Sequence, residues 1–95
     1  MDTMNIRGSA GVDDLHELRN HKLIVGMKQL RKALLRGGLL RVFLARDADP
    51  AVTEPLAELA QANGTEIVWV GKMHDLGRAC GIDVGAAAAA TLPEL

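Results

Sequence analysis

Short apolar runs typical of buried strands alternate along this chain with segments that have the apolar spacing of helices. The strand-type runs cover residues 23–25, 40–45 and 66–70, and glycine or proline stands near the ends of the helical segments between them. Strands that alternate with helices are typical of a sheet covered by helices. The alternation therefore predicts an α/β sandwich with helices on both sheet faces, and 95 residues suffice for one such domain.

The first two helices have recognisable start and stop signals. Leucines at helical spacing and two possible aspartate caps predict a short helix over residues 13–20, preceded by a flexible tail over residues 1–12. Apolar residues at spacings of three and four predict an amphipathic helix that begins after Gly26. The glycine pair 37–38 should end it.

The third helix carries contradictory signals. Asp49 and Pro50 form a good start, with the acid as cap and proline at the first helical position. Pro55 would then lie inside the helix and clash with the carbonyl four residues earlier. We therefore expect a single turn after Pro50 and a main helix that restarts with Thr53 as its cap and ends at the Asn-Gly pair 63–64.

The C-terminal third contains one clear element and one ambiguous segment. Residues 72–79 have the pattern of a short helix, which should stop near Gly81. Residues 82–92 are rich in alanine, which favours a helix, but Ile82 and Val84 also permit a strand. Propensity alone leaves both structures open for this segment.

Basic residues are concentrated in one part of the chain, although the formal net charge is only −1. Residues 18–46 contain no acidic residue, and acidic residues predominate on both sides of this basic segment. Its basic residues are Arg19, Lys22, Lys28, Arg31, Lys32, Arg36, Arg41 and Arg46. An ordinary solvated face would mix acids among the bases for pairing. The segment therefore predicts one surface for an anion such as nucleic acid.

The junction between the first strand and its helix has the groups that such a surface needs. A helix start offers free backbone N–H groups and a positive dipole end, and Gly26 lets a ligand approach this backbone closely. Lysine and glutamine side chains can contact phosphates and base edges. Polar side chains crowd this helix start at Lys28, Gln29, Arg31 and Lys32. An ordinary cationic helix is the alternative interpretation.

Other kinds of site have weak support. Phe43 and Trp69 are the only aromatic residues, and both lie in predicted strands, which argues against a sheet that binds RNA by stacking. His74 lies six positions before Cys80, about 240° away around a helix, so a cysteine nucleophile with an adjacent base is not indicated. The pair Asp47 and Asp49 could hold a divalent ion, but helix caps and turns explain it better. We expect no enzyme activity, no metal site and no cofactor.

The expected location is the cytoplasm. The chain has a single cysteine, which cannot form an internal disulfide, and it shows no secretory signal pattern. No apolar stretch approaches the roughly 18 to 20 residues that cross a bilayer. We therefore expect neither a membrane span nor a membrane partner.

Three motifs resemble the ribosomal protein L7Ae and L30e family, the kink-turn RNA binders, and most closely its small bacterial ribosome-associated branch. They are Ile-Val-Gly-Met-Lys-Gln at residues 24–29, Ala-Arg-Asp-Ala-Asp-Pro at 45–50, and Leu-Gly-Arg-Ala-Cys-Gly-Ile-Asp-Val-Gly at 76–85. The resemblance implies a three-layer α-β-α sandwich with a four-stranded mixed sheet, in which the alanine-rich tail is a strand. Residues 13–95 would form a single kink-turn RNA-binding-like domain.

The resemblance also implies two contact surfaces. In the family, the helix start after the glycine enters the widened major groove at tandem sheared G·A pairs, and a loop near the C-terminus covers nucleotides of the three-base bulge. Lysine and glutamine stand here at 28 and 29, where archaeal members have asparagine and glutamate, and methionine stands at 27, where threonine is usual. The predicted RNA-binding residues are Gly26, Met27, Lys28, Gln29, Arg31, Lys32, Arg78, Ile82, Asp83 and Val84.

The sequence thus predicts a non-enzymatic, monomeric protein that recognises and stabilises kink-turn RNA. Its partner would be a structured RNA with a kink-turn, and ribosomal RNA is a candidate. The alternative is a ribosome-assembly or protein-interaction module that keeps this fold without kink-turn specificity.

Overall fold

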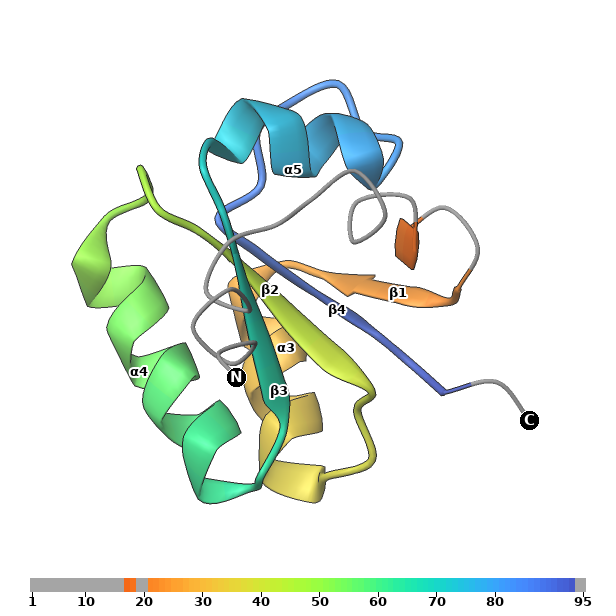
Figure 1. Cartoon of the computed structure of the whole chain (residues 1–95), viewed down its shortest axis with the longest axis vertical. Coiled ribbons are helices and arrows are strands. Elements are labelled where there is room, and N and C mark those ends of the chain that lie inside the picture. The colour runs from red at the N-terminus through yellow and green to blue at the C-terminus, as the bar shows by residue number, and fades with distance from the viewer. Residues whose placement is uncertain (1–16, 19–20, 94–95) are drawn as a thin grey trace, which may run out of the picture.

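The computed structural model describes residues 17–18 and 21–93, and its elements alternate between strands and helices (Figure 1). In chain order they are β1 (Leu23–Val25), α3 (Met27–Arg36), β2 (Arg41–Ala45), α4 (Pro50–Ala62), β3 (Glu66–Val70), α5 (Met73–Ala79) and β4 (Ala88–Thr91). The predicted alternation is confirmed. Of the predicted helix over residues 13–20, only Glu17 and Leu18 belong to the described residues, and both are helical. The predicted tail over residues 1–12 lies outside them.

The four strands form one mixed sheet with the order β1-β4-β2-β3. Strand β4 is antiparallel to both β1 and β2, whereas β2 and β3 are parallel. Ala89 of β4 lies between Val25 of β1 and Phe43 of β2. The alanine-rich segment therefore supplies a central strand, which resolves the ambiguity of residues 82–92.

Tertiary context explains why these alanines form a strand. All four residues of β4 are buried, and alternate alanines face opposite layers of the molecule. Ala89 packs into the core beneath α5, whereas Ala88 and Ala90 pack beneath α3 and α4. Two ladders of hydrogen bonds and burial on both faces outweigh the helix propensity of alanine, because strand preference depends mainly on context.

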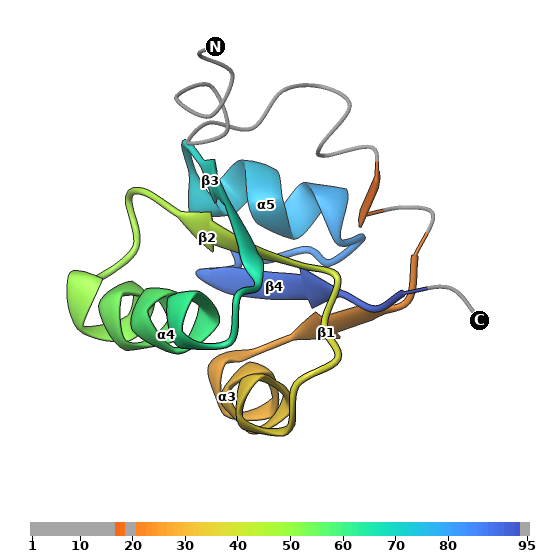
Figure 2. The ribbon, with the colours of Figure 1, turned by 60° about the horizontal axis from the view of Figure 1, so that its bottom comes forward.

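Helices cover both faces of the sheet (Figure 2). Side chains of β2 alternate between two cores, with Val42 and Leu44 on the α3 and α4 side and Phe43 and Ala45 on the α5 side. All four are fully buried. This alternation follows from the two-residue period of a strand. The predicted three-layer α-β-α sandwich with a four-stranded mixed sheet is confirmed.

Helix α4 corrects one prediction. It is continuous from Pro50 and contains Pro55, whereas we expected a break and a restart at Thr53. The Asp49 side chain accepts a hydrogen bond from the Ala51 N–H at 3.0 Å, so Asp49 is the cap. Thr53 is buried against the core. The missing N–H of Pro55 leaves only the carbonyl of Ala51 without its helical donor, and Ala51 is exposed, so water can satisfy this group.

The helices end where the sequence predicted that they would. Glycines at 37, 64 and 81 follow α3, α4 and α5, and all have positive φ angles. After α4, the Gly64 and Thr65 N–H groups donate to carbonyls of the last helical turn, as in a Schellman motif. Within the described part of the chain, no helix has both the length and the apolar character needed to span a bilayer.

The topology brings three helix starts to one edge of the sheet. Strands β1, β2 and β3 run in the same direction, and each is followed by a helix. Strand β4 runs the opposite way, so the loop over residues 82–87 that precedes it reaches the same edge. The start of α3 and this loop are therefore neighbours, although more than 50 residues separate them in the sequence.

Candidate nucleic-acid interface

The start of α3 presents an open row of backbone donors. Gly26 precedes the helix with a φ of 110°, a conformation that residues with a side chain rarely adopt. The Gly26 carbonyl accepts the first helical hydrogen bond, from the Leu30 N–H at 3.0 Å. The N–H groups of residues 27–29 have no intrahelical acceptor. No side chain in the described part of the chain caps them.

The other two helices at this edge have carboxylates at their starts. Asp49 caps α4, and the Asp47 carboxylate accepts from the Met73 N–H of α5 at 2.8 Å. The capping role expected for both aspartates is confirmed. Among the described residues, no group of three or more His, Cys, Asp or Glu side chains could hold a metal ion. At the start of α3, by contrast, no carboxylate of residues 17–18 or 21–93 caps the backbone N–H groups, and these groups are the kind that bind anions.

Cationic side chains surround this helix start. Lys28, Gln29, Arg31 and Lys32 are exposed, and the side chains of Leu30 and its apolar neighbours face the core. Helix α3 contains no acidic residue. Within the described residues, no side-chain hydrogen bond or ion pair involves any of the four. Their donors thus face solvent on the exposed side of α3.

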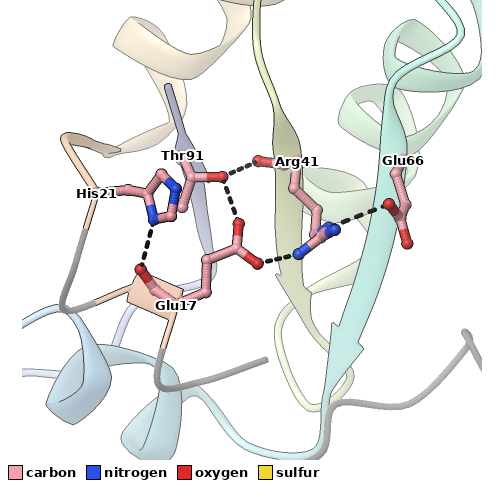
Figure 3. Close-up of polar contacts among 5 residues, drawn as sticks. All are labelled: Glu17, His21, Arg41, Glu66 and Thr91. Carbon is pink, nitrogen blue, oxygen red and sulfur yellow. Dashed lines mark hydrogen bonds and ion pairs between the residues drawn. The ribbon is translucent and has the colours of Figure 1, made fainter. Parts of the chain in front are cut away.

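Two other basic residues of the segment contact side chains of the protein itself. The Arg41 guanidinium forms ion pairs with Glu17 and with Glu66, the latter at 3.1 Å between Nε and Oε1 (Figure 3). Thr91 donates to Glu17 Oε2 at 3.1 Å and is fully buried. The Arg46 guanidinium lies 5.6 Å from the centre of the Trp69 ring.

The expectation that the whole basic segment forms one anion surface is therefore wrong. Acids outside the segment neutralise Arg41 from strand β3 and from the N-terminal part of the chain. Such long-range pairing cannot be seen in a charge count along the chain. Arg41 is therefore left out of the candidate anion surface, and the exposed basic residues of α3 remain in it.

The loop over residues 82–87 forms the second half of the candidate interface. Ile82 N–H donates to the Gly77 carbonyl at 3.1 Å, and Ala86 N–H donates to the Met73 carbonyl at 3.0 Å. These two bonds fasten both ends of the loop to α5. Val84 lies between them with 69% of its surface exposed, so the loop presents an apolar side chain to solvent.

A shallow hollow of about 250 Å³ joins the two halves. Gly26 and Met27 line one side of it, and Ile82 and Val84 line the other. The structure thus brings four of the predicted site residues together. The hollow itself was not predicted, because nothing in the sequence gives the distance between the helix start and the loop.

The remaining predicted residues lie around this hollow or away from it. Asp83 is exposed in the loop, and the four polar residues of α3 flank the helix start. Arg78 is different, because it lines a separate depression of about 410 Å³ together with His21 and Cys80. The structure does not bring Arg78 into the hollow.

The depression beside Arg78 lacks an activated nucleophile. Cys80 is half-buried, and this burial raises the pKa of its thiol above the ordinary value. A raised pKa keeps the thiol protonated, whereas nucleophilic cysteines are thiolates. His74 does not line the depression, in agreement with the helical spacing.

Comparisons with known proteins place the chain among RNA-associated relatives. It is 49% identical over 70 residues to an RNA-binding protein of Bacillus pumilus, a match that covers 74% of this chain and 85% of the relative. It is 39% identical over 75 residues to the RNA-binding protein YbxF of Geobacillus stearothermophilus, covering 79% and 92%. It is also 41% identical over 68 residues to the large ribosomal subunit protein eL8 of Halobacterium salinarum, covering 70% and 57%.

Solved structures share the fold. A 15.5 kD RNA-binding protein of Giardia lamblia superposes with a TM-score of 0.78 at 24% identity, covering 99% of this chain and 85% of that one. A protein of unknown function from Bacillus halodurans has a TM-score of 0.74 at 25% identity, covering 83% of both chains. The model of the ribosomal protein L7Ae/L30e/S12e/Gadd45 family matches residues 13–94, and the chain belongs to this family.

Proposed function

We propose that this protein is a non-enzymatic RNA-binding protein that recognises and stabilises kink-turn RNA. The observation that carries the proposal is the hollow between the open start of α3 and the apolar loop over residues 82–87. One side offers backbone donors and cations, and the other offers apolar side chains. The relatives named RNA-binding proteins support RNA as the ligand.

The α3 side supplies the polar contacts. Free N–H groups at residues 27–29 and the positive helix dipole attract phosphates or guanine acceptors. Lys28 and Lys32 lie one helical turn apart and can donate to guanine O6 and N7 in a widened major groove. Gln29 can both donate and accept, so its amide can pair with a base edge.

The loop side supplies apolar contacts. Met27, Ile82 and Val84 line the hollow, and a nucleobase that has left its stack has apolar faces that such side chains can cover. Tandem G·A pairs would lie against α3, and bulged nucleotides would lie against the loop. Binding both parts at once favours the bent RNA, because a protein shifts an RNA equilibrium by its differential affinity for the two forms.

A gel-shift comparison tests this proposal. The first RNA contains a kink-turn, and the second is identical except that Watson–Crick pairs replace its G·A pairs. We expect clear binding of the first RNA and much weaker binding of the second. If 3 to 5 phosphates are neutralised, the logarithm of the affinity should fall with the logarithm of salt at a slope of roughly −3 to −4. Equal binding of the two RNAs would contradict specific recognition.

A second function is a ribosome-assembly or protein-interaction module without kink-turn specificity. The relative named large ribosomal subunit protein eL8 is the observation that favours it. In that case the protein would co-sediment with ribosomal particles and bind the two RNAs equally. Size-exclusion chromatography with light scattering tests the accompanying expectation that the protein is a monomer.

A further inference from the structure

Met27 has an unusual place at the candidate interface. It is the first residue of α3, 49% of its surface is exposed, and it lines the hollow opposite Ile82 and Val84. Met73, the other methionine in the described residues, is half-buried under the loop, where its Cβ lies close to Gly85. The thioether that oxidants can reach most easily in the described part of the chain is therefore at the site itself.

Oxidation of this side chain changes the property on which the apolar contacts depend. A methionine side chain is flexible and apolar, and its sulfur makes favourable contacts with aromatic rings. Methionine sulfoxide is polar and disrupts methionine-rich contacts. Beside the open N–H groups of α3, the sulfoxide oxygen would also be an acceptor that competes with the phosphate or base of an RNA.

We propose that Met27 is a reversible oxidation site through which hydroperoxides weaken the binding of RNA. The inference rests on the proposed function, because it concerns the regulation of the same hollow. Both effects would lower the affinity for RNA. The side of the hollow formed by Met27 becomes polar, and the N–H groups at the helix start acquire an acceptor within the protein. Reduction of the sulfoxide would restore the original surface.

The chemical step needs only a hydroperoxide such as hydrogen peroxide. A lone pair of the Met27 sulfur attacks one peroxide oxygen, an S–O bond forms and the O–O bond breaks. The second oxygen leaves with the electron pair of that bond, and a proton passes to it from the oxygen now bound to sulfur, directly or through water, which gives the sulfoxide and, from hydrogen peroxide, water. The sulfur loses two electrons and the peroxide gains them, and methionine sulfoxide reductases reverse the change with thiol electrons.

Cys80 is a poorer target for the same oxidant. The thiolate is the reactive form of cysteine, and burial of Cys80 holds its thiol protonated. Cys80 also lines the other depression, away from the hollow. A loss of RNA binding that follows oxidation of Cys80 would have to act indirectly.

The test compares the full chain with its Met27→Leu variant, which keeps an apolar side chain of similar volume. Both proteins are treated with hydrogen peroxide, oxidation is located by peptide mass spectrometry, and affinity for one kink-turn RNA is measured. We expect oxidation at Met27 to weaken binding by the wild-type protein about tenfold, as expected for a lost sulfur–aromatic contact and a polar wall. Peroxide should leave the affinity of Met27→Leu unchanged, because this variant has no thioether at residue 27. It retains Cys80 and every other methionine, so it controls for oxidation elsewhere in the chain.

Three further results bear on the inference. Saturating RNA should protect Met27 from peroxide, the two sulfoxide reductases that act on the two sulfoxide epimers should together restore binding, and Met27→Gln should weaken binding without peroxide. Unchanged affinity of protein oxidised at Met27 would overturn the inference and leave the proposed function standing. The same loss in Met27→Leu would also overturn it. Failure of the untreated wild-type protein to prefer the kink-turn RNA would overturn the proposed function, and the inference with it.

Discussion

The carbonyl oxygen of Val84 lies where the β-carbon of a side chain at Gly77 would be, so no side chain fits between α5 and the loop over residues 82–87 at this point. Gly77 is buried, and its own carbonyl accepts the hydrogen bond from the Ile82 N–H. Because residue 77 has no side chain, the backbone at Val84 can lie directly on α5. This contact positions the apolar half of the candidate interface.

Gly77→Ala should displace the loop and weaken RNA binding. A β-carbon at this place would overlap the Val84 carbonyl, so the backbone of the loop must move. Such overpacking costs about 1 to 3 kcal/mol of unfolding free energy, which urea denaturation can measure. Gel shifts should show a loss of affinity at temperatures where the variant remains folded.

Gly71→Ala is the matched control. Gly71 lies at the same sheet edge, has no atom of the described residues within 4 Å of the position of an added Cβ, and has no positive φ angle. We expect its stability and affinity to stay close to those of the wild-type protein. Equal effects of the two substitutions would mean that the close contact with Val84 does not position the loop.

Gln29→Ala and Lys32→Ala should each reduce affinity for kink-turn RNA by about 1 to 3 kcal/mol if each side chain contacts a base. Both side chains are exposed on the first two turns of α3, so their removal should change unfolding free energy by less than about 0.5 kcal/mol. If the lost side chain contacts a base of the G·A pairs, the variant should also prefer the kink-turn RNA less strongly over the RNA without G·A pairs. Titrations of both RNAs measure this preference.

Lys22→Ala provides a control for charge alone. Lys22 is exposed and precedes β1, at the opposite end of this strand from Gly26. Its removal lowers the net charge as much as Lys32→Ala does. A similar loss of affinity in both lysine variants would argue that total charge, rather than the position of Lys32 on α3, determines binding.

Local signals in the sequence predicted most of the elements. Gly26 and Gly37 bound α3 as expected, because φ angles accessible to glycine interrupt a helix. Sequence reasoning failed at Pro55, where the capping carboxylate of Asp49 and the exposed carbonyl of Ala51 make a continuous helix tolerable. The alanine strand β4 could not be derived from propensity, since its two partner strands are far away in the sequence.

The candidate site was predictable only in part. The helix start could be found because Lys28 and Gln29 directly follow Gly26 in the sequence. Arg41 pairs with Glu17, which is 24 positions away in the sequence, and with Glu66, which is 25 positions away. The charge pattern along the chain therefore counted Arg41 in an anion surface from which these ion pairs remove it. The hollow depends on where the loop is held above α5, which is a property of the packed molecule.

Arg41→Gln should destabilise the protein without weakening RNA binding directly. The Arg41 side chain is 23% exposed and its guanidinium pairs with two carboxylates, so the substitution removes these ion pairs with Glu17 and Glu66. Hydrogen bonds to charged groups contribute about 1.5 to 3 kcal/mol, and we expect a loss of about 2 kcal/mol in urea denaturation. Affinity measured well below the melting temperature should be unchanged.

Arg36→Gln is the stability control for this prediction. Arg36 is exposed in the last turn of α3, where a cation interacts favourably with the helix dipole by about 0.3 to 1 kcal/mol. Its removal should therefore cost less than the removal of Arg41. If the two substitutions cost the same, the three-residue cluster with Glu17 and Glu66 does not stabilise the fold.

Alkylation of Cys80 should be slow in the native protein and should require a higher pH than in the unfolded chain. Burial raises the pKa of this thiol, so the native state holds its proton at pH values where the unfolded chain has begun to lose it. The resulting stability is fully present below the unfolded pKa and is lost as the pH rises through the folded pKa. Iodoacetamide rates measured from pH 7 to 10.5, in buffer and in urea, give both midpoints. Cys80→Ala should remove the corresponding alkaline loss of stability, and a native midpoint at or below the unfolded one would contradict burial of the thiol.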